Sequence, residues 1–171
     1  MKKLNLIIFV YILNIFFLSN TFAVNSKIAF IDFNTILENS DKGKKLLDEL
    51  NSLNQKNIED LKSKEASLKK KEEELIKKKN LISNEAFNKE LNELKNKINK
   101  FREDKNSMVK NFNDKKNKNI NAFIKSIDPI IKDYMKTESI EMLIERKNIV
   151  IGDKKLDITQ DIIKKINLEL N

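Results

Sequence analysis

A dense block of charged residues runs from Leu68 to Ser83, with the sequence LKKKEEELIKKKNLIS. Nine of its 16 residues are charged, in groups of three of one sign. A lysine ammonium is a flexible point charge that binds carboxylates and phosphates without demanding one geometry. The block therefore predicts a surface that contacts acidic proteins or an anionic membrane through Lys69, Lys70, Lys71, Lys77, Lys78 and Lys79.

The same block also has a simpler interpretation, as a solvated face of a helix. Glu73 and Lys77 stand four residues apart in the favourable order, as do Glu74 and Lys78. Each such pair stabilises a helix by about 0.2–0.5 kcal/mol. Under this interpretation the lysines keep the segment soluble and bind nothing.

The side chains that most often carry catalysis are missing. The chain has no Cys and no His, so no thiol nucleophile, imidazole base or His/Cys zinc site can form. Asp32 is expected to be a capping or interface residue. Asp48 and Glu49 are neighbours, which point in different directions on a helix. An enzyme is therefore the least favoured class, and no cofactor or metal is expected.

The net charge of +8 and the pI near 9.4 raise the alternative of nucleic-acid binding. The excess of positive charge lies in the middle of the chain, where 22 basic and 14 acidic residues lie between Lys44 and Lys125. However, acids are interleaved throughout, only Arg102 and Arg146 are arginines, and no nucleic-acid-binding motif is present. A nucleic-acid partner is therefore not expected.

The first 23 residues have the pattern of a secretory signal peptide. Lys2 and Lys3 precede an apolar run, and small residues, Thr21 and Ala23, precede the expected cleavage after Ala23. The alternative is an uncleaved anchor, because the run approaches the roughly 20 residues of a spanning helix. An exported chain without cysteines must gain its stability from helices or from oligomerisation.

A helical heptad pattern begins at about Lys44. One position per heptad is occupied by Leu47, Asn54, Leu61, Leu68, Leu75 and Ile82. Leu50 and Ile58 flank it at the start, whereas the flanking positions further out are expected to be Glu65, Glu72 and Lys79. This is a stripe one residue wide, which is too narrow for a two-layer core.

A second apolar stripe follows in a different phase. It consists of Phe87, Leu91, Leu94, Ile98, Phe101, Met108 and Phe112. A reversal near residues 80–84, with Ser83 or Asn84 capping the returning helix, explains the change of phase. We therefore expect an antiparallel helical hairpin over residues 44–127. The alternative is a single rod of roughly 130 Å.

Strand patterns occur only near the two ends of the chain. The segment from Lys27 to Phe33 indicates a strand, followed by a helical turn capped by Asn34. Asp128 and Pro129 are expected to start a new short helix. The runs IEMLIE and NIVIGD then predict a β-hairpin, and the chain is expected to end in a helix capped by Asp157 or Thr159.

The order of these segments resembles the Skp family of OmpH-like periplasmic chaperones. The resemblance rests on the signal peptide, the opening KIAFIDFNTILENSDKGKKLLDEL, the lysine-rich hairpin and the ending YMKTESIEMLIERKNIVIGDKKLDITQDIIKKIN. It implies an α+β fold. Residues 24–43 and 128–171 would form a small trimeric β-body, from which the coiled-coil hairpins project like the tentacles of a jellyfish.

The resemblance also implies a function. Such proteins hold unfolded outer-membrane β-barrel proteins in the periplasm, without ATP, in a cavity between the arms of a homotrimer. The body would then include Ile28, Phe30, Ile149 and Ile151. The arm stripe that lines the cavity would include Leu61, Leu68, Leu75, Ile82, Phe87, Leu91, Leu94, Ile98 and Phe101. The remaining alternative is a structural coiled-coil spacer of the cell envelope.

Overall fold

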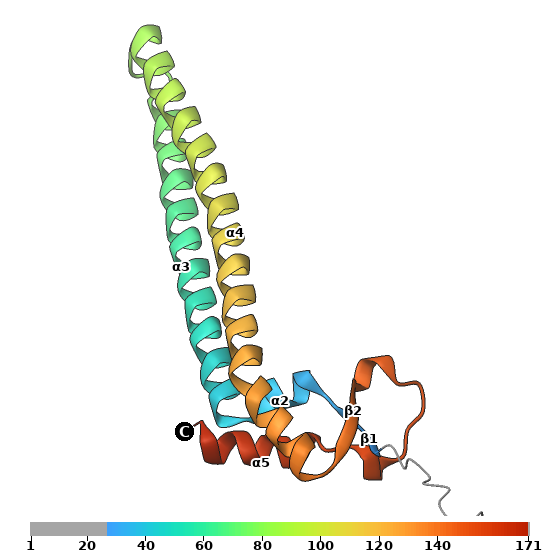
Figure 1. Ribbon diagram of the computed structural model, residues 1–171. Helices are drawn as coiled ribbons and strands as arrows, with labels where there is room; N and C mark the ends of the chain where they lie inside the picture. The colour runs from blue at the N-terminus through green and yellow to red at the C-terminus, as the bar shows by residue number, and fades with distance from the viewer. Residues whose placement is uncertain (1–26, 171) are drawn as a thin grey trace, which may run out of the picture.

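The structure is a computed structural model that describes residues 27–170, so the expected signal peptide lies outside the described residues. Two long helices form an arm that rises from a small body, and both ends of the described chain lie in this body (Figure 1). The predicted combination of a helical hairpin and a small body with a sheet is therefore confirmed.

The arm is built from α3, Asp41–Lys78, and α4, Asn84–Thr137. Ser40 caps α3 by accepting a hydrogen bond from the Gly43 N–H at 3.2 Å, and Ser83 caps α4 by accepting from the Ala86 N–H at 3.2 Å. The chain reverses between the two helices, where the phase of the apolar stripe predicts it. With 38 residues and a rise of about 1.5 Å per residue, α3 is about 57 Å long.

The expected helix start at Pro129 is wrong, because α4 continues through it. Proline removes one backbone hydrogen bond and costs a helix interior about 3 kcal/mol. Ile127, Ile130 and Ile131 surround Pro129 in the sequence and are all buried in the body. Each buried aliphatic side chain contributes roughly 1.5–3 kcal/mol, so packing offsets the missing bond. The lower end of α4 bends away from the arm, as expected for a proline kink (Figure 1).

The sheet contains two strands from opposite ends of the chain. The first strand, β1, is Lys27–Ile31, and it pairs in parallel with β2, Ile140–Glu145. Between β1 and α3 lies α2, Phe33–Asn39, whose N-cap is Asp32 and not the predicted Asn34. The Asp32 carboxylate accepts a hydrogen bond from the Thr35 N–H at 3.1 Å, which is the geometry that an N-cap requires.

The predicted hairpin of IEMLIE and NIVIGD is wrong. After β2 the chain forms a short 3-10 helix, η1, Arg146–Asn148, and residues 149–151 form no strand. Val150 and Ile151 are 97% and 91% exposed. Strand propensity depends on context, and here β2 pairs with β1 and not with the run that follows it.

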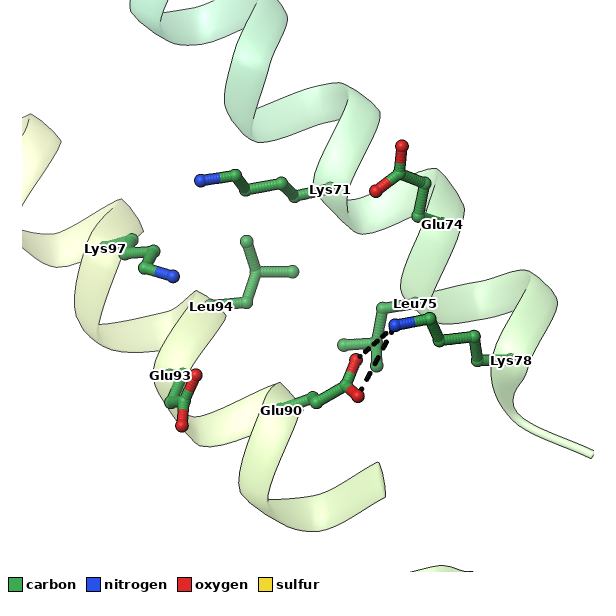
Figure 2. Close-up of a pocket in the computed structure, with 8 residues that line it drawn as sticks. All are labelled: Lys71, Glu74, Leu75, Lys78, Glu90, Glu93, Leu94 and Lys97. Atoms are coloured by element: carbon green, nitrogen blue, oxygen red, sulfur yellow. Dashed lines mark hydrogen bonds and ion pairs between the residues drawn. The ribbon is translucent and has the colours of Figure 1, made fainter. Parts of the chain in front are cut away.

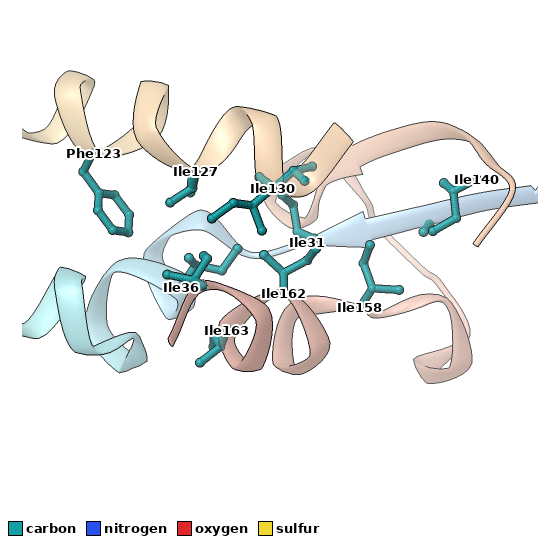
Figure 3. Packing of buried hydrophobic residues seen from close by; sticks show 12 residues of the cluster. Ile31, Ile36, Phe123, Ile127, Ile130, Ile140, Ile158, Ile162 and Ile163 are labelled. Carbon is teal, nitrogen blue, oxygen red and sulfur yellow. The ribbon is translucent and has the colours of Figure 1, made fainter. Parts of the chain in front are cut away.

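The body has one hydrophobic core, which is formed mainly by isoleucines (Figure 3). The last helix, α5, Thr159–Glu169, contributes Ile162, Ile163 and Ile166. It follows a second 3-10 helix, η2, Lys154–Leu156. The prediction that Asp157 or Thr159 caps this helix is wrong, because its N-cap is Ile158, which makes no capping hydrogen bond through its side chain. Asp157 instead accepts a hydrogen bond from the N–H of Thr159, the first residue of the helix, at 3.0 Å. The core therefore joins segments that lie more than 100 residues apart in sequence.

Two further properties concern residues 27–170 only. No helix there is long and apolar enough to cross a membrane. The same residues contain no group of three or more acidic side chains arranged to hold a metal ion.

Candidate functional site

The seam between α3 and α4 is one apolar residue wide along most of its length. The nine predicted stripe residues, from Leu61 to Phe101, are all buried or half-buried. In the outer half of the arm only Leu75 and Leu94 are fully buried, with 6% and 7% exposure. The outer arm is therefore held together by few apolar contacts.

The residues of α3 that flank the leucine stripe, here called the second row of the seam, differ from the predicted ones. The sequence pattern places Ile58, Glu65, Glu72 and Lys79 beside the stripe, but all four are exposed. The residues beside the stripe are instead Lys64, Lys71 and Lys78, which line hollows between the helices. Residues that face a partner helix are separated by alternating steps of three and four. The prediction took a step of four after Leu61, Leu68 and Leu75, whereas the residues that line the seam follow these leucines by three.

The outermost hollow has a volume of about 280 Å³ and surrounds the Leu75–Leu94 contact (Figure 2). Lys78 reaches across the seam, and its Nζ lies 3.1 Å and 3.4 Å from the two carboxylate oxygens of Glu90. This pair replaces the predicted pair of Glu74 with Lys78. No ion pair joins Glu73 to Lys77 in the part of the chain that the structure describes.

Two more hollows continue toward the body. One, of about 220 Å³, has Leu68 and Phe101 in its lining together with Lys64, Lys71, Lys97 and Lys100. The next, of about 440 Å³, is lined by Leu53, Met108 and Phe112 among polar residues. In these hollows half-buried apolar side chains lie beside lysine ammonium groups.

Sequence reasoning missed Lys64, Lys97 and Lys100 as lining residues. For Lys64 the signal was present, because Lys64, Lys71 and Lys78 recur every seven residues in the register of Leu50. Of the six lysines that were predicted at the tip, Lys71 and Lys78 face the hollows. The other four, Lys69, Lys70, Lys77 and Lys79, are exposed and line none of these three hollows.

The predicted body residues have different environments. Phe30 is buried, with 5% exposure, and Ile149 is half-buried. Ile28 is 41% exposed and Ile151 is 91% exposed. Together with Met142, which pairs with Ile28 in the register of the two strands, they leave apolar surface on the outside of the body.

The shifted pKa values lie in the body, where α5 docks on α4. The Lys165 ammonium forms a hydrogen-bonded ion pair with Asp133, which lowers the pKa of the Asp133 carboxyl and raises the pKa of Lys165. Burial, together with the nearby Asp161, raises the pKa of Tyr134. These groups fasten the last helix to α4.

Comparison with known proteins gives one family and one fold. The family model described as "Outer membrane protein (OmpH-like)" matches residues 27–166. A crystal structure of a candidate OmpH-like outer membrane chaperone from Caulobacter crescentus superposes with a TM-score of 0.79 at 15% sequence identity. The superposition covers 89% of this chain and 90% of that one. No curated protein matches this chain in sequence.

Proposed function

Because the chain belongs to the OmpH-like outer membrane protein family, we propose that it is a periplasmic holdase. It binds unfolded outer-membrane β-barrel proteins and keeps them from aggregating before membrane insertion, without ATP. The signal-peptide pattern at its start supports export to that compartment. The client is held between arms of several copies of the chain.

The observation that carries the proposal is the incompletely filled seam of the arm. Half-buried Leu68, Phe101 and Met108 lie at hollows that open along the arm. An unfolded chain offers apolar side chains at irregular spacing, and a row of shallow apolar sites can accept many of them. Each contact is weak, which suits a protein that must release its client without using ATP.

The charge of the arm supports the same role. Lysines around the hollows attract acidic segments over about one Debye length, roughly 8 Å at physiological salt. Any binding to the unfolded state lowers the concentration of free unfolded chain and so slows its aggregation. Apolar contact and charge therefore act together on the same clients.

A homotrimer is part of the proposal. A two-stranded sheet is marginal by itself, and here it carries the exposed Ile28 and Met142 on its outside, with Ile151 exposed nearby in the chain. Burial of these side chains between copies would complete the body and place three arms around one cavity.

Sedimentation of the mature protein should give a trimer. Ile28→Asp should shift it to the monomer, because a new charge would be buried at the contact. A monomer in the unsubstituted protein would contradict this part.

The chaperone proposal is tested by dilution of a urea-unfolded β-barrel membrane protein into buffer, with aggregation followed by light scattering. The mature protein should suppress the scattering at near-stoichiometric amounts without ATP. Undiminished aggregation over a wide range of ratios would refute the proposal.

A matched pair of variants tests the contribution of charge. Lys64→Gln/Lys100→Gln removes two lysines that line the hollow around Phe101. Lys62→Gln/Lys95→Gln removes two exposed lysines of the same helices that line none of the three hollows. The first pair should weaken client protection more than the second. Equal effects would assign the attraction to the overall charge of the arm.

A further inference from the structure

Three hollows of the seam follow one another along the arm. They are named here the outer, middle and inner hollow, and their linings contain Leu75, Leu68 and Met108 respectively. The outer hollow is the one in Figure 2. Neighbouring hollows share lining residues and therefore form one continuous row. The shared residues are Lys71 and Lys97 for the outer pair, and Lys64 and Asp104 for the inner pair.

The row opens on one flank of the arm. In the middle hollow, Ser67 precedes Leu68 in α3, and Lys100 precedes Phe101 in α4. A helix turns by about 100° per residue. Because α3 and α4 are antiparallel, the positions that precede the seam residues lie on the same side of both helices. The corresponding lining residues of the other two hollows are Glu74, Glu93 and Ser107.

The spacing of the row matches a helix. Leu68 and Leu75 are seven residues apart in α3, as are Phe101 and Met108 in α4, and seven residues span about 10.5 Å of a helix. A helix that packs alongside repeats its apolar face at this same interval. In an extended chain the side chains of one face recur after roughly 6.7 Å, so they fall out of step with successive hollows.

The charge around the row indicates what the helix carries. The middle hollow is lined by four lysines and one acid, Asp104. The outer hollow has three lysines and three glutamates, and the inner hollow has two lysines and one aspartate. The excess of positive charge is therefore greatest at the middle hollow. Acidic side chains would be attracted there, whereas the lysine-rich arm of a second copy would be repelled.

We propose that this flank of the arm binds an amphipathic, acidic helix of a partner protein, as the third helix of a coiled coil. Aliphatic side chains at heptad spacing enter the hollows, and glutamates or aspartates beside them lie against the lysines of the middle hollow. One face of the partner helix supplies all the anchors, as in other grooves that bind helices. This interaction goes beyond the chaperone function, because the partner is a helix and not an unfolded client.

Fluorescence anisotropy with two labelled peptides tests the recognition of a helix. The heptad peptide repeats three heptads with leucine at the first and fourth positions and glutamate at the flanking positions, whose mutual repulsion keeps the peptide from pairing with itself. The control peptide has the same composition, with its leucines at alternate positions as in a strand. The heptad peptide should bind about tenfold more tightly. Equal affinities would show attraction by charge alone and would overturn the proposal.

Circular dichroism tests the form in which the peptide binds. Short helices are marginal by themselves in water, so the free heptad peptide is mostly unfolded. Its mixture with the protein should therefore show more helix than the sum of the two separate spectra. Binding without a gain of helix would overturn the proposal.

A matched pair of variants locates the contact. Ser67→Trp places an indole at the mouth of the middle hollow. Ala66→Trp places the same group at the neighbouring position, which is also exposed and lines none of the three hollows. Ser67→Trp should weaken binding of the heptad peptide about tenfold, and Ala66→Trp less than about twofold. Equal affinities of the two variants would place the peptide elsewhere and overturn the proposal.

The lysine variants of the chaperone test examine the acidic side chains of the partner. Lys64→Gln/Lys100→Gln should weaken binding of the heptad peptide more than Lys62→Gln/Lys95→Gln does, because only the first pair lines the middle hollow. Equal losses would contradict the placement of the acids beside that hollow.

The light-scattering assay with an unfolded client separates this proposal from the chaperone function. A protein that protects the client but does not bind the heptad peptide would overturn the helix site and leave the chaperone proposal intact. A protein that binds the heptad peptide but protects no client would refute the chaperone proposal alone.

Discussion

The outer arm should open as a local unit when its single buried contact is weakened. Leu75→Ala removes most of the side chain that packs on Leu94, and both leucines are more than 90% buried. In a closed protein core such a change costs about 2–5 kcal/mol, depending on how far the site can collapse. The contact here already borders a hollow of about 280 Å³ that water can enter. We therefore expect the lower end of that range, about 2 kcal/mol.

Native-state hydrogen exchange, read by mass spectrometry of peptides, measures this loss where it occurs. A change of about 2 kcal/mol accelerates exchange through local opening by roughly 30-fold. Peptides from the outer parts of α3 and α4 should show this increase. Peptides around Ile127 and Ile162, which lie in the core of the body, should not change.

Ile76→Ala is the matched control, since it truncates the next residue of the same helix, which is 65% exposed. It should alter exchange less than twofold. Two results would refute the reasoning: equal effects of Leu75→Ala and Ile76→Ala, or acceleration throughout the body by Leu75→Ala. The second result would mean that arm and body unfold together.

Two further predictions concern the body. A Cβ atom at Gly43 would lie 2.1 Å from the Leu37 carbonyl oxygen. Gly43→Ala should therefore force apart the α2–α3 corner and lower the free energy of unfolding, measured by urea titration, by about 3 kcal/mol. A change below about 0.5 kcal/mol would contradict the close packing. The Asp133–Lys165 pair should make stability depend on pH. The lowered pKa of Asp133 gives stabilisation that is present above its unfolded value near 3.8 and is lost as the pH falls through the folded value. The raised pKa of Lys165 gives stabilisation that is fully present below the unfolded pKa of 10.5 and is lost as the pH rises through the higher folded pKa. Thermal melts of Asp133→Asn should therefore differ from those of the unsubstituted protein at pH 7, and the difference should shrink as the pH falls below 3.8 and through the lower folded pKa of Asp133; a constant difference at all pH values would show that the effect is not ionic.

The arm could be predicted from the sequence because its signals are local and periodic. The change of phase between Ile82 and Phe87 places the turn, and a serine at residue 83 has the side chain that an N-cap needs. The second row of the seam was harder to predict. Lysines there contribute their aliphatic stems to the surface and keep their charges in water, so hydrophobicity alone does not mark the row.

The body was predictable in composition but not in pairing. Lys27–Ile31 and Ile140–Glu145 are both recognisable strands, but their parallel pairing spans more than 100 residues and leaves no local signal. The run around Val150 has strand composition but pairs with no strand in the described part of the chain. At Pro129, burial of the neighbouring isoleucines outweighs a local preference that would otherwise end the helix.

The repeated spacing of the seam has a consequence for how the length of the arm can vary. Leu68 and Leu75 line hollows of the seam one heptad apart, and the half-buried Leu61 precedes them by one heptad. Each of the three is followed three residues later by a lysine. Each heptad is therefore a nearly independent unit whose loss leaves its neighbours intact, much as in repeat proteins. Removal of one heptad from α3 and one from α4 at the same level would shorten the arm by about 10 Å without disturbing the turn or the body. The reach of the arm can thus be adjusted in steps of one heptad, while the fold that anchors it stays constant.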